Sequence, residues 1–227
     1  MCDYLENVGA SPGRSGHRLA ASAGRILFQT RKALARLFNL NDPGRIIFTE
    51  NATGALNLAL FGLLQPGDRV LTTSLEHNAV MRPLRRLEEL RQITIDILPG
   101  TATSHYDLEL MAGWCRRRKY RLAVINHASN VIGTLAPLAK ILPILRENGI
   151  ISVIDGAQSA GSYPFDLSQL DPDIFCFTGH KCLFGPPGAS KYSHFPAGDS
   201  TACSRIFQYG GRDERGCGRD CGDSRRA

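Results

Sequence analysis

The sequence lacks any long hydrophobic run: in 227 residues no apolar stretch approaches the roughly 20 residues that a bilayer-spanning helix needs. Its first residues, Met1-Cys2-Asp3-Tyr4, also lack the basic and apolar segments of a signal peptide. The seven cysteines are scattered and odd in number, unlike those of a disulfide framework. These absences argue against a membrane protein and against a small disulfide-stapled domain, and we expect a cytoplasmic protein.

The sequence gives little support for nucleic-acid binding or for metal binding. The net charge of +6 suggests nucleic acid, but the basic residues are spread along the chain and no nucleic-acid reading motif accompanies them. Cys217 and Cys221, with Cys203 and His194 before them, are a conceivable zinc set. Their spacing matches no standard ligand pattern, so unpaired thiols are the simpler interpretation. We therefore expect neither nucleic-acid binding nor a metal site.

What the chain does have is an alternation of helical and strand patterns. Apolar residues at helical spacing predict helices over 17–38, 53–64, 79–90, 108–118 and 137–148. Short apolar runs predict strands over 45–49, 69–73, 93–98, 122–126, 150–154 and 174–177. This order is typical of an α/β fold with a mostly parallel sheet sandwiched by helices. We expect a partial N-terminal arm over 1–15, a large domain over 16–188, and an irregular, disordered or frame-shifted tail over 189–227.

A lysine and an aspartate stand out because both follow predicted strands. Lys181 ends the segment Phe177-Thr178-Gly179-His180-Lys181, and Asp155 lies 26 residues earlier. Such a lysine can hold pyridoxal 5'-phosphate (PLP) as an imine, and such a carboxylate can keep the pyridine nitrogen protonated. Taken singly, Lys181 reads equally well as a surface charge, and Asp155 as a helix cap or a core ion pair.

Other residues of matching chemistry also fall at predicted strand ends. The turn Thr49-Glu50-Asn51-Ala52-Thr53-Gly54 leads into a helix, so the backbone amides of Ala52, Thr53 and Gly54 are candidates for an anion site. The alternative is a Thr that only caps this helix. The donors Thr178 and His180 suit a phosphate, Gln158 can reach a phenolic oxygen, and His77 can stack on a ring or begin a helix. Ligands bind at the carboxyl ends of parallel strands, so His77, Asn126, Asn130, Asp155 and Lys181 are expected to converge.

These motifs, in this order, resemble the class V aminotransferase/cysteine desulfurase family of PLP fold-type I enzymes, and its cysteine-desulfurase-like branch most of all. The resemblance covers roughly residues 7–188. The segments that carry it are Gly13-Arg14-Ser15-Gly16-His17, Phe48-Thr49-Glu50-Asn51-Ala52-Thr53-Gly54, Glu76-His77-Asn78-Ala79-Val80, Asn130-Val131-Ile132-Gly133-Thr134, Asp155-Gly156-Ala157-Gln158 and Thr178-Gly179-His180-Lys181.

The resemblance implies a role for each matching position. Lys181 is implied as the lysine that carries PLP and, with His77, as a catalytic residue. The implied cofactor contacts are Asp155 with the pyridine nitrogen, Gln158 with the phenolic oxygen, His77 with the ring face, Asn130 with cofactor and substrate, and Ala52, Thr53, Thr178 and His180 with the phosphate. A homodimer, a cysteine substrate and a sulfur-accepting partner protein are implied as well.

The family pattern stops after Gly188. The small domain, the antiparallel strand beside the lysine, the substrate-binding arginine and the sulfur-accepting cysteine are not recognisable, and none of Cys182, Cys203, Cys217 and Cys221 has the context of that nucleophile. We expect a chain truncated at both ends. Three functions remain open: desulfuration of cysteine, PLP binding without turnover, and another class V reaction such as a transaminase, lyase or epimerase.

Overall fold

The computed structural model describes residues 6–12, 17–100, 106–185 and 205–209. Its helices are α2 (Arg18–Leu37), α3 (Ala52–Leu63), α4 (Asn78–Arg91), α5 (Leu108–Arg117), α6 (Leu138–Glu147) and α7 (Leu167–Leu170), with a short 3-10 turn at Pro43–Arg45. Its strands are β1 (Ile46–Thr49), β2 (Arg69–Thr73), β3 (Thr94–Leu98), β4 (Leu122–Asn126), β5 (Ile151–Asp155), β6 (Ile174–Thr178) and β7 (Arg205–Tyr209).

These strands form one sheet in the order β1-β7-β6-β5-β4-β2-β3. The pairs from β6 across to β3 are all parallel, whereas β7 lies antiparallel to both of its neighbours, β1 and β6. Two strands that are each antiparallel to β7 run in the same direction, so β1 also points the same way as β6. The predicted mostly parallel α/β sheet is confirmed.

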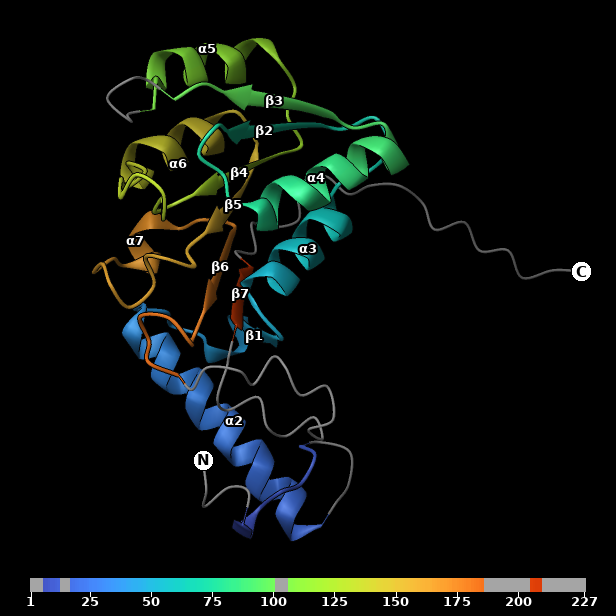
Figure 1. Cartoon of the computed structure of the whole chain (residues 1–227). Helices are drawn as coiled ribbons and strands as arrows, with labels where there is room; N and C mark the ends of the chain where they lie inside the picture. The colour runs from blue at the N-terminus through green and yellow to red at the C-terminus, as the bar shows by residue number, and fades with distance from the viewer. Residues whose placement is uncertain (1–5, 13–16, 101–105, 186–204, 210–227) are drawn as a thin grey trace, which may run out of the picture.

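Helices cover both faces of the sheet (Figure 1). On one face α3 and α4 pack together, while α5, α6 and α7 follow one another on the opposite face. Each face has its own buried cluster: Leu56, Leu60 and Leu84 belong to the cluster under α3 and α4, and Ile141 and Phe175 to the other. The inner strands β4, β5 and β6 are thus buried on both sides, which explains their largely apolar runs. The described part of the chain has no helix that is both long and apolar enough to span a bilayer.

Two elements were not predicted. The sequence analysis assigned residues 189–227 to an irregular tail, but 205–209 form β7, which pairs over its whole length with β1 and β6. This strand fills what would otherwise be two open sheet edges with unpaired backbone groups. An antiparallel strand beside the strand that leads to Lys181 is therefore present, contrary to the expectation. The four-residue helix α7 was missed because it is too short to show a helical period.

The carboxyl ends of β1, β2, β4, β5 and β6 all meet at one edge of the sheet. The register places Asn126 at the end of β4 directly opposite Asp155 at the end of β5. Gly156 follows Asp155 and needs its hydrogen side chain, because a Cβ there would lie 2.1 Å from Cζ of the buried Phe175. Close packing of Gly156 on Phe175 thus holds the end of β5 in place.

Candidate cofactor-binding site

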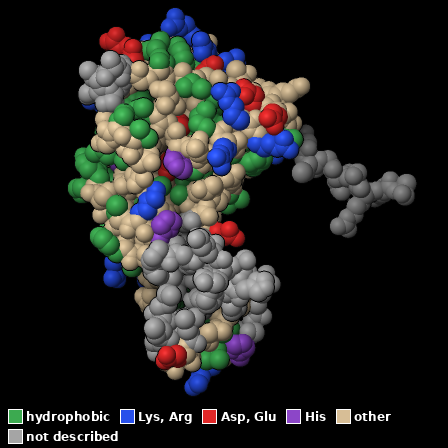
Figure 2. Space-filling model, in the orientation of Figure 1, with side chains coloured by type: hydrophobic (Ala, Val, Ile, Leu, Met, Phe, Trp, Pro, Cys, Tyr) green, Lys and Arg blue, Asp and Glu red, His purple; other side chains and the backbone are tan. Residues whose placement is uncertain are grey.

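A cavity of about 210 Å³ lies at this edge of the sheet. Its described lining includes all nine predicted cofactor-binding residues: Ala52, Thr53, His77, Asn130, Asp155, Gln158, Thr178, His180 and Lys181. Asn51, Ala79, Asn126 and Ala157 complete the lining. The expected convergence of His77, Asn126, Asn130, Asp155 and Lys181 is therefore observed. Histidine and basic side chains gather near the middle of the face shown in Figure 2.

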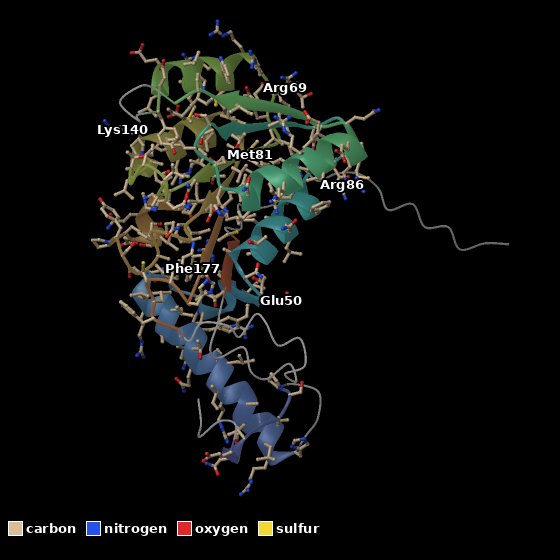
Figure 3. The ribbon with its side chains drawn as sticks, in the orientation of Figure 1. Glu50, Arg69, Met81, Arg86, Lys140 and Phe177 are labelled. Carbon is tan, nitrogen blue, oxygen red and sulfur yellow. The ribbon has the colours of Figure 1, made fainter. Side chains whose placement is uncertain are left out.

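The start of α3 contributes one wall of the cavity. Asn51 caps this helix, since its Oδ1 accepts a hydrogen bond of 2.7 Å from the Gly54 amide. The alternative of a capping Thr is thereby excluded, and Thr53 is an exposed residue in the cavity lining. One expectation is corrected: the Gly54 amide is used by the cap, so only Ala52 and Thr53 remain of the three amides assigned to an anion. Glu50 immediately precedes the cap, at the turn from β1 into α3 (Figure 3).

Asp155 forms the acidic part of the cavity. The residue is only 3% exposed, and its Oδ1 accepts a hydrogen bond of 3.0 Å from the Ala157 amide. Burial raises the pKa of Asp155, while the Ala157 amide and the positive charges of Lys181 and His77 act in the opposite direction. A cation placed against this carboxylate would offset the cost of its burial.

His77 has a structural role beside any functional one. It is the N-cap of α4, and its Nδ1 accepts a hydrogen bond of 3.0 Å from the Ala79 amide. The helix-start alternative is therefore correct for this residue. Because Nδ1 is the acceptor, the neutral ring carries its proton on Nε2. Capping also fixes the ring at the cavity, since both His77 and Ala79 belong to the lining.

The segment after β6 forms a compact turn around Lys181. The Thr178 hydroxyl and Nδ1 of His180 lie 2.8 Å apart and share a hydrogen bond. The Phe184 amide donates to the Lys181 carbonyl, and the Gly185 amide donates to the Gly179 carbonyl. Thr178 is buried while Lys181 is exposed, so the turn carries the ammonium group from the sheet edge into an open part of the cavity.

Asn130 and Gln158 occupy two further loops at the rim. Asn130 is exposed in the loop after β4, where the Ser129 hydroxyl accepts hydrogen bonds from the amides of Val131 and Ile132. Gln158 is partly buried in the turn after β5, and its carbonyl accepts a hydrogen bond from the Ser162 hydroxyl. These local bonds hold the two backbones and leave both side-chain amides at the cavity.

Glu76 was not predicted from the sequence, and it lies just outside the cavity lining. Its Oε1 accepts hydrogen bonds from the Thr73 hydroxyl at 2.7 Å and from the Asn126 amide at 3.0 Å. The sequence signal was weak, because a glutamate before a helix start normally indicates a solvated side chain. Only the fold shows that this carboxyl group turns inward to the end of β4.

A larger cavity of about 490 Å³ lies beside α6 and α7. It is lined mainly by apolar residues such as Leu138, Leu142 and Phe165, and it contains none of the predicted site residues. Burial lowers the pKa of His127 in its wall to about 4, so this imidazole is neutral at physiological pH. The smaller cavity therefore remains the candidate for chemistry. Groups of His, Cys, Asp or Glu suited to a metal ion are absent from the described residues, and Cys203, Cys217, Cys221 and His194 lie outside those residues.

Comparisons with known proteins agree with this architecture. The fold matches that of an apo cysteine desulfurase from Thermococcus onnurineus NA1 (TM-score 0.78, 26% identity, covering 92% of this chain and 48% of that chain). A mutant of C-DES with glycine covalently linked to its PLP cofactor also matches (TM-score 0.73, 28% identity, covering 91% of this chain and 50% of that chain). The fold is thus that of PLP fold-type I proteins.

The sequence comparisons narrow this class to a family. The family model described as Aminotransferase class-V matches residues 1–191. A probable cysteine desulfurase from Pseudomonas aeruginosa is 34% identical over 188 residues, which are 82% of this chain and 46% of that protein. The chain belongs to the class V aminotransferase family, and it spans about half the length of the curated relatives that it matches.

Proposed function

We propose that the cavity at the sheet edge binds PLP and that Lys181 is the residue that holds it covalently. One observation supports this proposal above the others: Lys181, Asp155 and the phosphate-type donors line the same cavity although they come from three separate strand ends, those of β1, β5 and β6. The buried Asp155 suits a cationic ring nitrogen, and the large domain over 16–188 supplies every residue of the set. When bound, PLP acts as an electron sink for bonds at the substrate α-carbon.

The other residues of the cavity lining would bind the phosphate and the ring of the cofactor. The amides of Ala52 and Thr53 at the helix start, with the side chains of Thr178 and His180, bind the phosphate. His77 would contact the cofactor ring, and its Nε2 can hold or pass a proton.

Two amides and the lysine complete the assignment. Gln158 donates to the phenolic oxygen, and Asn130 orients cofactor and substrate. The amine of Lys181 would supply a base for the proton on the substrate α-carbon.

For the reaction we propose desulfuration of cysteine to alanine with transfer of the sulfur to a partner protein. Support comes from the relatives, whose names describe cysteine desulfurases. Two of the three described cysteines bear on the sulfur acceptor: burial raises the pKa of Cys115 to about 11 and that of Cys176 well above its usual value. Both thiols therefore stay protonated and are poor nucleophiles. The alternatives are PLP binding without turnover and another class V reaction.

A homodimer is part of the same proposal. Several large apolar side chains are exposed on α2 and beside it: Leu19, Phe28, Leu37 and Ile47. Exposed apolar surface of this kind marks contact sites. Sedimentation of the purified chain is expected to give twice the monomer mass, and a monomer at all concentrations would contradict this part. The cytoplasmic location stays a prediction.

The test is a PLP titration followed by a turnover assay. We expect the wild-type chain to give a visible absorbance band with PLP, and Asp155→Asn to weaken PLP binding at least about tenfold because the ring nitrogen loses its anionic partner. Cysteine added to the PLP-bound chain together with dithiothreitol, which reduces the removed sulfur atom to sulfide, should release alanine and sulfide in equal amounts. A band without any alanine would favour the non-catalytic alternative, and no band at any PLP concentration would refute the cofactor site.

A further inference from the structure

Glu76 joins two strand ends beneath the cofactor cavity. Its Oε1 accepts from the Thr73 hydroxyl at the end of β2 and from the Asn126 amide at the end of β4. The Asn126 side chain returns a hydrogen bond of 3.2 Å to the Leu75 carbonyl. Since Asn126 is paired in register with Asp155, the Glu76 carboxyl group is bonded to the backbone next to the acidic residue of the cavity.

The other oxygen of this carboxyl group is in an unusual position. Oε2 of Glu76 is fully buried and, among the described residues, has no hydrogen-bond partner. The described residues include no ion pair to Glu76. A buried carboxylate without a cation is costly, whereas a carboxylic acid in the same place avoids most of that cost.

The charged and titratable groups around Glu76 also favour the acid. Burial raises its pKa to about 8, against the lowering effect of the Asn126 and Thr73 hydrogen bonds, and the negative charge of Asp155 on β5 raises it further. Tyr106, just before α5, donates to the Asn126 carbonyl, and burial raises its own pKa to about 12, so it brings no charge. The positive charge of Lys181 acts on Asp155.

We propose that Glu76 is a positioning residue of the cofactor site: it is a neutral carboxylic acid that ties β2 to β4 and leaves Asp155 as the carboxyl group that a cation bound in the cavity would meet. This inference rests on the proposed function. Asp155 is the one acidic side chain among the described residues of the cavity lining. The two neighbouring carboxyl groups have different surroundings: that of Glu76 is held by two hydrogen bonds inside the fold, whereas that of Asp155 can gain a cationic partner in the cavity.

PLP binding by variants of the full chain distinguishes the role of Glu76 from that of Asp155. Glu76→Gln keeps an oxygen acceptor for Thr73 and Asn126 without a titratable proton, whereas Glu76→Ala leaves the Asn126 amide unpaired. Glu89→Gln is the matched control, because Glu89 is exposed and pairs with Arg86 on the outer side of α4 (Figure 3). We expect Glu76→Gln to bind PLP within about twofold of the wild type and Glu76→Ala to bind at least about tenfold more weakly.

Infrared spectroscopy detects directly whether the Glu76 carboxyl group is protonated. At pH 7 the wild-type spectrum minus that of Glu76→Gln should contain the carbonyl band of a protonated carboxylic acid, and the Glu89→Gln difference should contain carboxylate bands instead. A carboxylate band for Glu76, or a loss of PLP binding in Glu76→Gln as large as in Asp155→Asn, would overturn the inference. A wild-type chain that shows the acid band but binds no PLP would refute the proposed function and, with it, the assignment of Glu76 to a cofactor site.

Discussion

The protonation of Glu76 makes the stability of the fold depend on pH. The pKa of this carboxyl group rises from 4.5 to about 8 on folding, mainly through burial. Each pKa unit is worth about 1.4 kcal/mol, so the whole shift corresponds to about 5 kcal/mol. A group with a raised pKa stabilises the folded state fully below its unfolded pKa. The contribution then falls as pH rises and is lost once pH passes about 8.

Other titratable groups also change the free energy of unfolding in this pH range. Measurements on the wild type alone therefore do not isolate the effect of Glu76. The pKa of His127 is lowered to about 4 by burial, and this neutral imidazole makes the fold more stable as pH rises from about 4 toward 6.5. Glu76→Gln retains His127 and removes only the Glu76 proton. The difference between the two proteins therefore isolates the effect of Glu76.

The assay is urea unfolding at half-unit steps from pH 5 to pH 9, followed by the fluorescence of the single tryptophan, Trp114 on α5. Relative to Glu76→Gln, the wild-type free energy of unfolding should fall by about 3 kcal/mol between pH 5 and pH 7 and should level off above about pH 8. A difference that stays flat across this range would refute the reasoning, since it would mean that Glu76 has the same pKa in both states.

Three further predictions concern stability around the site, each measured by urea unfolding. Gly156→Ala should cost about 3 kcal/mol or more, because the new Cβ overlaps the Phe175 ring; an unchanged midpoint would contradict this packing. Asn51→Ala should cost about 1 kcal/mol through loss of the α3 cap and should also weaken PLP binding. Asp96→Asn, at an ion pair with Arg69 on the far strands, should cost about 1 kcal/mol and leave PLP binding unchanged, which makes it the control for Asn51→Ala.

Much of the fold was predictable because each element carries a strong local pattern. The strands 69–73 and 122–126 were predicted at their observed bounds, since they are short apolar runs between clear turn signals. Strand β7 was not predictable, because a five-residue run is stabilised by pairing with β1 and β6, which are distant in sequence. Such pairing leaves no signal in the run itself.

Some residues of the candidate site were likewise predictable from the sequence, and others were not. Residues at strand ends, such as Asp155 and Lys181, were predictable because parallel strands bring their carboxyl ends to one edge. The cap at Asn51 and the inward turn of Glu76 were not, since each depends on which of several polar side chains reaches a particular amide. Those choices are settled by backbone geometry that the residue types alone do not specify.

The most direct test of the account locates the attachment of PLP. The full chain is incubated with PLP, reduced with borohydride, digested and analysed by peptide mass. The account predicts the mass of reduced PLP on the peptide that contains Lys181, and no such label in Lys181→Ala. Exposed lysines such as Lys140 on α6 (Figure 3) serve as internal controls for non-specific labelling. Equal labelling of Lys140 and Lys181, or no label on Lys181, would contradict a cofactor site at this edge of the sheet.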